Sequence, residues 1–439
     1  MMTYALPAAP VQFFYLLLLM MYLKYATDTL GASPSVVGMI FLVARVWDAV
    51  SDPLVGNLSD NTVSRLGRRR SWLLASAPLL FVFGIMAWAP PEGLVGWQLT
   101  AWIAVSVIGF YTAYTIFEVP HMALGAEITL ESQGRSRIFG ARHLLRTLGM
   151  LSAAFATQAV MDDPEGGAAV QTATIAAVIA VATLVYSVFK LPPEREDFMG
   201  RGGESPFKAM HDVLENRHAR LLLFVYFIES LGAGGISMMI PFALQYVMGL
   251  PELTGRMLGF TFALSILSIP IWVALAQRFE KRRLWLGAMA MSGLGFGMLV
   301  PLGEGDWPLM MVSSLFIGLS TSCGSILGQA LKAEIVDFDE YETGERKEGS
   351  YFAAWSFVGK LASGVMVAVV GFVLDNVGYV PNAAQTDDVK WWIVFLISWF
   401  PLCGYLIGSM VFLRFDLSEA EHRRIRTLLD ARSARQEGD

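Results

Sequence analysis

Long apolar segments constrain the fold of this chain more than any other feature. A helix needs roughly 20 apolar residues to cross about 30 Å of hydrocarbon. We count twelve such segments, near 8–29, 36–57, 72–90, 97–124, 138–161, 168–190, 219–247, 255–277, 284–302, 307–332, 350–374 and 391–413. Because 55% of the 439 residues are hydrophobic and only 16% are charged, the composition argues against a water-soluble domain. The sequence therefore predicts an all-α membrane protein with twelve transmembrane helices.

The loops between these segments alternate in charge, and this alternation predicts the orientation of the chain. The first 25 residues lack the basic start of a cleavable signal peptide, so we expect them to run into the first spanning helix. Basic residues gather after every even-numbered segment, whereas the other loops hold few beyond Arg256 and Lys390. Cytoplasmic loops are the ones enriched in Lys and Arg. We therefore expect both termini to be cytoplasmic.

The chain divides into two similar halves. "SDNTVSRLGRRRSWLL" follows the second segment and "LAQRFEKRRLWLG" follows the eighth, while "ALGAEITLESQGRSR" and "ALKAEIVDFDEYETGERK" follow the fourth and tenth. A matched offset of this kind indicates a duplicated six-helix unit with a midplane site between its copies. We predict an N-terminal bundle over 1–190, a cytoplasmic linker over 191–218, a C-terminal bundle over 219–414 and a cytoplasmic tail over 415–439.

Several ionisable residues lie inside the apolar segments. Each costs at least about 2.5 kcal/mol at the centre of a spanning helix, so each implies a partner or a watery cavity. Asp48 and Asp52 are four residues apart and share one helical face. Two close carboxylates repel unless a cation lies between them, and hard oxygens suit Na⁺. Our hypothesis is a charge network of Asp48, Asp52 and Lys360, with Arg45 balancing part of the charge. The alternative is a structural Arg45–Asp48 pair beside a solvated Asp52.

Other charged residues have two interpretations at this stage. Glu118 and Arg142 in neighbouring segments form either a structural pair or a site for a polar ligand. Glu229 precedes the run "GAGG", which predicts a flexible or broken helix and favours a gating role. Lys24 and Arg256 lie near segment ends and are expected to extend to the membrane interface. Because no nucleophile–base set or metal cluster is recognisable, we expect neither an enzyme nor a cofactor.

A run in the second segment carries a family resemblance. "FLVARVWDAVSDPLVGNLSDNTVSRLGRRRSWLL" resembles the helix 2 signature and following loop of the glycoside–pentoside–hexuronide:cation symporters, the melibiose permease-like family of the major facilitator superfamily. The resemblance continues through "YTIFEVPHMALGAEIT", "RSRIFGARHLLRTLG" and "GSYFAAWSFVGKLASG" and covers essentially the whole chain. It implies the major facilitator fold, with twelve transmembrane helices in two pseudo-symmetric six-helix bundles and transport by alternating access.

The resemblance also implies a coupling-cation site. The two helix 2 carboxylates and the helix 4 threonine of the family match Asp48, Asp52 and Thr115, where Na⁺ or H⁺ would bind. The helix 11 lysine matches Lys360. Ser51 stands between the aspartates where the melibiose permease type has an amide.

The family's sugar site matches this chain less closely. Its helix 4 acid and helix 5 arginine match Glu118 and Arg142, but Glu118 is longer than the family's aspartate. Its helix 1 acid falls at Gln12, which brings an amide and no charge. A galactoside is thus disfavoured, and another glycoside, a uronide or a non-sugar is open. The alternative is a lysolipid-like or other amphipathic anion, since the vertebrate sodium-dependent lysolipid transporter shares the helix 2 signature.

Together these features predict a secondary active symporter in the cytoplasmic (inner) membrane of a bacterium. Its partners would be a small polar solute, a coupling cation (Na⁺ or H⁺) and membrane lipids, without nucleic acid. A non-transporting sensor or a membrane enzyme is the alternative from another class. We expect a cytoplasmic gate that closes by salt bridges among Asp60, Arg65, Arg68 and Arg69.

Overall fold

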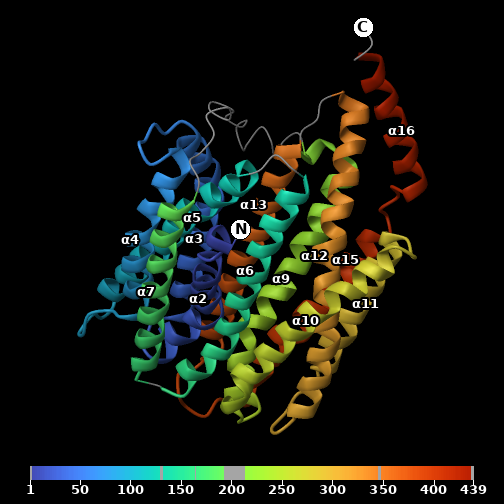
Figure 1. The fold of residues 1–439 in the computed structure, drawn as a ribbon. Helices are drawn as coiled ribbons and strands as arrows, with labels where there is room; N and C mark the ends of the chain where they lie inside the picture. The colour runs from blue at the N-terminus through green and yellow to red at the C-terminus, as the bar shows by residue number, and fades with distance from the viewer. Residues whose placement is uncertain (1, 129–131, 164, 192–212, 345–347, 437–439) are drawn as a thin grey trace.

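The computed structural model describes residues 2–128, 132–163, 165–191, 213–344 and 348–436, and all regular structure in these ranges is helical (Figure 1). The N-terminal half contains α1 (Met2–Ala5), α2 (Ala8–Asp28), α3 (Pro34–Asp60), α4 (Arg68–Trp88), α5 (Trp97–Glu127), α6 (Ser132–Met161) and α7 (Gly167–Lys190). Most of the predicted linker, residues 192–212, lies outside the described ranges.

The C-terminal half repeats this helical plan. It contains α9 (Arg217–Phe242), the π-helix η2 (Ala243–Val247), the 3₁₀ turn η3 (Pro251–Leu253), α10 (Thr254–Ala276), α11 (Lys281–Met298), α12 (Trp307–Thr343), α13 (Glu348–Asn376), α14 (Asp387–Ile397), α15 (Trp399–Phe412) and α16 (Glu419–Gln436). α14 and α15 follow one another with a break at Ser398 and together make the last membrane span.

Eleven of the described helical stretches are long and apolar enough to cross a membrane. The predicted segment that is missing from this set, 284–302, corresponds to α11. α11 has 18 residues and opens with Lys281, Arg282 and Arg283, which shorten its apolar part. It nevertheless packs between α12 and α15 within the C-terminal half. The chain is an integral membrane protein whose fold is all-α, as the apolar segments predicted.

Local sequence signals explain where several helices begin and end. The side chain of Asn216 accepts hydrogen bonds from the backbone N–H groups of His218 and Ala219 and so caps the start of α9. Thr386 caps α14 in the same manner through the N–H of Val389. Gly344 ends α12 with φ at +75°, a left-handed conformation that suits glycine at a helix C-terminus.

The two halves meet along two main pairs of helices, α3 with α13 and α6 with α10. Glycines let α3 and α13 approach closely. A Cβ atom on Gly371 would lie 2.1 Å from the carbonyl oxygen of Pro34, and one on Gly38 would lie 2.8 Å from that of Val367. Small residues serve this purpose in membrane helix pairs, because they allow backbone-to-backbone contact.

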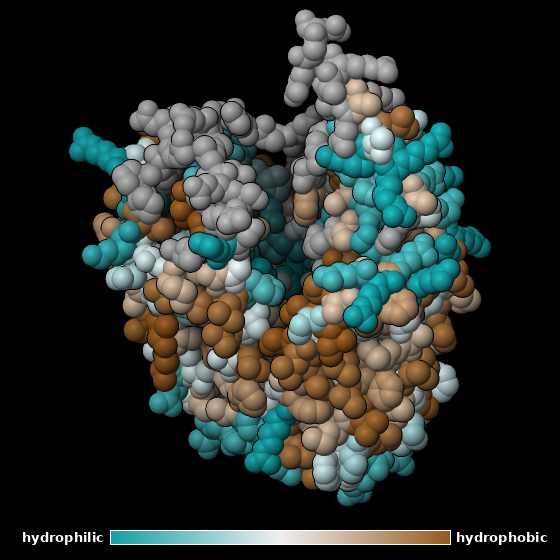
Figure 2. Space-filling view, turned by 45° about the vertical axis from the view of Figure 1, so that its right-hand side comes forward, coloured by the Kyte–Doolittle hydropathy of each residue, from teal (hydrophilic) through white to brown (hydrophobic). Residues whose placement is uncertain are grey.

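A hollow separates the halves at one end of the molecule. Figure 2 shows this hollow opening at the top, the end from which α16 extends in Figure 1, with hydrophilic residues on its walls and hydrophobic residues around the middle of the outer surface. Below it, towards the other end, the surface is continuous in this view. An open end and a closed end are what an alternating-access transporter shows in one of its states.

Candidate cation and solute site

Helix α3 carries both central aspartates, one turn apart. Asp48 is fully buried and Asp52 is partly exposed. Pro53 lies inside the helix directly after Asp52. A proline removes one backbone N–H and loosens the turn before it, which leaves polar backbone groups available near this position.

Two hydroxyl groups join the aspartates. The Thr115 hydroxyl of α5 donates to Asp48 Oδ1 at 2.7 Å and lies 3.3 Å from Asp52 Oδ1. Ser51 Oγ lies 3.4 Å from Thr115 Oγ1. These four side chains bring carboxylate and hydroxyl oxygens together, which is the donor set that hard cations prefer.

Lys360 connects this oxygen cluster to the other half of the molecule. Its ammonium nitrogen, on α13, lies 2.6 Å from Asp52 Oδ2 and 3.1 Å from Asp48 Oδ2. The pair therefore crosses the α3–α13 contact. Of the two alternatives posed from sequence, the geometry fits the network that includes Lys360.

Arg45 takes part in this network more loosely. Its Nη1 lies 3.6 Å from Asp48 Oδ2, while its guanidinium lies over the rings of Tyr111 and Tyr15, at 4.5 and 4.9 Å from their centroids. Among the described residues, Nε and Nη1 of Arg45 have no hydrogen-bond acceptor. The aromatic faces therefore stabilise this buried cation in addition to Asp48.

A second polar cluster lies in the N-terminal half around Glu118. Its Oε1 accepts from Arg142 Nη2 at 2.6 Å and lies 3.4 Å from Arg146 Nη1. Arg146 Nε donates to Gln12 Oε1 at 2.7 Å. The three residues expected to bind solute, Gln12, Glu118 and Arg142, thus belong to one cluster. Arg146, an intramembrane charge to which the sequence assigned only a structural role, completes it.

His121 orients Arg142 within this cluster. Its Nδ1 accepts from Arg142 Nε at 3.1 Å, so the proton belongs on Nε2, which lies 2.8 Å from the carbonyl oxygen of Tyr4. The Tyr4 hydroxyl donates to the carbonyl oxygen of His121 at 2.8 Å, and the two rings stack. Tyr4 of α1 therefore holds His121 in place, and His121 in turn orients Arg142.

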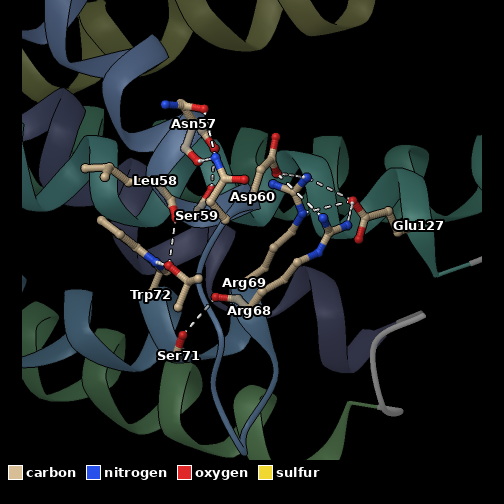
Figure 3. Close-up of polar contacts among 12 residues, drawn as sticks. Asn57, Leu58, Ser59, Asp60, Arg68, Arg69, Ser71, Trp72 and Glu127 are labelled. Carbon is tan, nitrogen blue, oxygen red and sulfur yellow. Dashed lines mark hydrogen bonds and ion pairs between the residues drawn. The ribbon is translucent and has the colours of Figure 1, made fainter. Parts of the chain in front are cut away.

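The basic residues after α3 form a compact cluster at the open end (Figure 3). Arg69 Nη2 lies 2.5 Å from Asp60 Oδ1 and 2.9 Å from Glu127 Oε1, and Arg68 Nη2 lies 2.8 Å from the same Glu127 oxygen. Figure 3 shows both guanidiniums between the two carboxylates. Arg65 is exposed and has no described partner. The four residues of these ion pairs lie in α3, α4 and α5, which all belong to the N-terminal half.

Glu127 was missed from sequence, although the repeat could have identified it. "ALGAEI" aligns Glu127 with Glu334 in "ALKAEI", and "GRRRSW" aligns Arg68 with Lys281 in "EKRRLW". Lys281 Nζ lies 2.7 Å from Glu334 Oε1, just as Arg68 pairs with Glu127. Each half therefore holds the same ion pair between equivalent helices.

The closed end is sealed by a second set of contacts that the sequence did not predict. The Asp28 carboxylate accepts from the hydroxyls of Tyr379 at 2.5 Å and Tyr246 at 2.6 Å, and its carbonyl accepts from Asn382 Nδ2 at 2.7 Å. These three partners all come from the C-terminal half. The prediction that Lys24 extends to the interface is wrong, because Lys24 is buried, pairs with Asp28 and lies over the rings of Phe242 and Tyr246.

Two helical bundles with a hollow between them and a charged cluster at their contact define a secondary transporter of the major facilitator fold. The family model described as MFS/sugar transport protein matches residues 3–419, and the chain belongs to this family. Membership and the symporters among the relatives support cation-coupled symport of a sugar or glycoside.

Individual relatives agree with this assignment. The chain is 27% identical over 414 residues to the isoprimeverose transporter of Lactiplantibacillus pentosus, covering 92% of this chain and 85% of the relative. It is 25% identical over 451 residues to the sodium-dependent lysophosphatidylcholine symporter 1 of Mus musculus, covering 93% and 83%. The crystal structure of a D-xylose–proton symporter has the same fold, with a TM-score of 0.67, 13% identity and coverage of 95% and 97%.

Proposed function

We propose that this protein couples the entry of Na⁺ or H⁺ to the uptake of a sugar or glycoside across the inner membrane of a bacterium, with both termini in the cytoplasm. One observation carries the proposal. Asp48, Asp52 and Thr115 form an oxygen cluster on the N-terminal half, and Lys360 of the C-terminal half forms ion pairs with both carboxylates. A cation bound there acts on the contact between the two halves.

Charge balance supports a mechanism for the coupling. Asp48 and Asp52 carry two negative charges, while Lys360 and Arg45 carry two positive charges, so the network is neutral without any added ion. An extra cation would leave an uncompensated buried charge, which is strongly unfavourable. We infer that the incoming cation displaces Lys360 from Asp52. Release of that pair loosens α3 from α13.

The solute would bind beside the cation site, at the Glu118 cluster. Glu118 is one carboxylate between two guanidiniums, so the cluster carries one excess positive charge. Glu118 Oε2 and part of Arg146, whose side chain is 35% exposed, are available to a ligand. Bidentate recognition of a carboxylate is typical of arginine. The charge therefore favours a uronide, while Gln12 and Glu118 suit neutral hydroxyls as well.

The proposed orientation makes the structure an inward-open state. The end with the basic loops and the hollow would face the cytoplasm, and the Asp28 contacts would close the outer end. The division into an N-terminal bundle, a linker over 191–218, a C-terminal bundle and a tail follows the same scheme. The Asp60, Arg68, Arg69 and Glu127 cluster would act as a gate by orienting helix ends within its half; Arg65 has no contact that supports this role.

Sodium binding and uptake test the proposal together. Purified wild type and Asp52→Asn are compared for ²²Na⁺ binding from pH 5.5 to 8.5. In proteoliposomes, uptake of isoprimeverose and methyl glucuronide is driven by a Na⁺ gradient or by a pH gradient. We expect saturable binding or proton-driven uptake that Asp52→Asn abolishes. Uptake by the variant that still follows either gradient would contradict the proposed cation site.

An amphipathic anion is the second candidate solute. A mostly apolar cavity of about 420 Å³ lies between α2, α6 and α7. Residues of α2, α6 and α7 line it, including Phe13 and Leu145, the sequence neighbours of Gln12 and Arg146. An apolar slot between helices is the arrangement expected for the acyl chain of a lipid-like solute. Lysophosphatidylcholine uptake under the same gradients distinguishes the two candidates, since a sugar carrier should leave this lipid untransported.

A further inference from the structure

A polar cavity lies inside the C-terminal half, and its lining residues are distinct from those of both clusters described above. Its volume is about 170 Å³, and its walls come from α9, α11, α12 and α15. Glu229, Ser230, Ser292 and Ser320 contribute polar groups, and Tyr226 and Tyr405 contribute two phenols. Polar walls are unusual in the interior of a membrane bundle, because each buried polar group must find a partner.

Glu229 is the central group of this cavity. Its Oε1 accepts a hydrogen bond from the indole Nε1 of Trp285 at 2.6 Å, and Trp285 itself is only 1% exposed. A Cβ atom on Gly324 would lie 2.9 Å from Glu229 Oε2, so that glycine leaves room for the carboxylate. Within the described ranges, no Lys, Arg or His forms an ion pair with Glu229. The sequence predicted a flexible or broken helix after Glu229, and the structure shows no break, because α9 continues through the glycine run.

Trp285 has a counterpart in the N-terminal half, but the counterpart's indole does not bond to a carboxylate. The repeat aligns Trp285 with Trp72, whose indole donates to Thr62 near the end of α3 instead. The indole of Trp285 points to an intramembrane carboxylate. It fixes Oε1 and leaves Oε2 to accept donors from a ligand.

The size of the cavity allows a ligand larger than a bare ion. One water molecule occupies about 30 Å³ of the liquid. A bare monovalent ion would therefore leave most of the 170 Å³ empty. Ser292 and Ser320 lie 2.6 Å apart, and Ser320 donates to the carbonyl oxygen of Ile317 at 3.0 Å, so Ser292 donates to Ser320 and keeps lone pairs that can accept from a ligand. A carboxylate oxygen with several hydroxyls suits a group that has many hydroxyl donors of its own.

Tyr226 connects this cavity to the clusters of the N-terminal half. A Cβ atom on Gly359, the neighbour of Lys360, would lie 2.8 Å from the Tyr226 hydroxyl. Lys360 in turn forms ion pairs with Asp52 and Asp48 of the cation site. Thr115, which donates to Asp48, precedes Glu118 on α5 by about one helical turn. The side chains of the cation site therefore lie between the wall of this cavity and the Glu118 cluster.

We propose that the Glu229 cavity is a second solute subsite, in which Glu229 Oε2 accepts a hydroxyl of a sugar whose other part lies at the Glu118 cluster. The inference rests on the proposed function and specifies it. The solute would be an extended glycoside that contacts both halves, and a single sugar ring would fill only one of the two subsites.

Binding of isoprimeverose to the full-length protein in nanodiscs tests this subsite, with glucose and xylose as single-ring probes. Glu229→Gln keeps the size of the side chain but places a donor where the ligand needs an acceptor. We expect Glu229→Gln and Ser320→Ala to weaken isoprimeverose binding about tenfold, the loss typical of a hydrogen bond to a charged group, while ²²Na⁺ binding is unchanged. Binding of the single-ring probe that occupies the Glu118 cluster should not change.

Ser313→Ala is the matched control. Ser313 is a buried serine of the same helix, α12, and donates to the carbonyl oxygen of Gly295 at 2.8 Å, outside the cavity. Unchanged isoprimeverose affinity in both Glu229→Gln and Ser320→Ala overturns the inference alone, and altered ²²Na⁺ binding with unchanged sugar affinity makes the cavity an ion site instead. Failure of the wild type to take up any sugar probe overturns the proposed function, and the inference with it.

Discussion

Lys360 would serve as the internal counter-ion of the proposed cation site. Its ammonium lies 2.6 Å from Asp52 and 3.1 Å from Asp48, with 17% of its side chain exposed. An ammonium so close to two carboxylates occupies the space that a sodium ion would need, and it lowers the attraction of the pair for any other cation. Under the proposed function, the lysine and the coupling ion compete for the same oxygens.

Replacing Lys360 with methionine removes this competitor while keeping an unbranched side chain. We expect Lys360→Met to bind ²²Na⁺ about tenfold more tightly, because the carboxylates lose their built-in cation, and to lose sodium-driven accumulation, because the ion no longer acts on α13. Equilibrium ²²Na⁺ binding and proteoliposome uptake measure both effects.

Lys390→Met is the control, since Lys390 lies at the start of α14, away from the cluster. Sodium binding by Lys360→Met that is equal to or weaker than that of the wild type would show that Lys360 supports the cation site and does not compete for it.

At the scale of elements, the α3–α13 contact decides how closely the halves approach. Gly371 and Gly38 place backbone against backbone near the closed end, and Gly364 packs against the stem of Arg45 near the cation site. The two helices therefore pack backbone against backbone near the closed end and form the Asp52–Lys360 ion pair further along their length. Movement of either helix would change both the backbone contact and the ion pair.

A larger side chain at Gly371 should separate these helices at the closed end. Its Cβ would lie 2.1 Å from the carbonyl oxygen of Pro34, which is backbone and cannot move aside alone. We expect Gly371→Val to favour the outward-open state. A cysteine at Ser35, in a background with Cys323→Ala and Cys403→Ser, should then react several-fold faster with a membrane-impermeant thiol reagent.

Gly287→Val provides the comparison within a helix, because a Cβ atom at Gly287 meets nothing within 4 Å. Equal labelling rates in the two valine variants would mean that the α3–α13 contact does not hold the outer end closed.

The sequence was sufficient to predict the helices and the residues of the central network, because apolar length and the cost of intramembrane charge are local signals. The "WDAVSDPLVG" run identified Asp48 and Asp52, and the mid-helix position of Lys360 identified a partner. The basic residues of the loop after α3 predicted the cluster of ion pairs but not its second acid, Glu127. This residue lies 58 positions after Arg69, on a different helix.

The contacts of Asp28 at the closed end could not be predicted from the sequence, for a related reason. Lys24 and Asp28 form an (i, i+4) pair that the sequence could have suggested. Their remaining partners, Tyr246 and Tyr379, are separated from Asp28 by 218 and 351 residues, and ordinary interface tyrosines look the same in sequence. Only the packing of the halves brings them together, as it brings Arg146 to Gln12.

At the scale of the whole molecule, the closed end depends on hydrogen bonds to two acidic residues, Asp28 and Asp375. Burial beside the Asp28 carboxylate raises the pKa of Tyr379 well above its usual value, so its hydroxyl remains a donor throughout the physiological pH range. Ser33 and Ser35 of the N-terminal half add hydrogen bonds to Asp375 at 3.1 and 2.5 Å. These contacts must all break before the outer end can open.

Tyr379→Phe removes one donor to Asp28 and keeps the ring. A hydrogen bond to a carboxylate contributes about 1.5–3 kcal/mol, so the variant should raise the population of the outward-open state roughly tenfold or more. Pulsed EPR between spin labels at Glu165 and Asp388, in the cysteine-replaced background, should reveal a longer distance.

Tyr186→Phe is the matched change, because Tyr186 is 49% exposed on α7. Identical distance distributions for the two phenylalanine variants would exclude Asp28 and Tyr379 as the outer seal.

The neutral charge network has an electrical consequence for the transport cycle. With Lys360 in place, the empty carrier moves no net charge at this site when it returns, so its return step is insensitive to the membrane potential. The loaded step carries the charge of the ion, and about 2.3 kcal/mol per elementary charge is available to it from each 100 mV. A lysine that replaces the ion in the empty state would thus let the membrane voltage drive uptake. The same voltage would not oppose the return of the empty carrier.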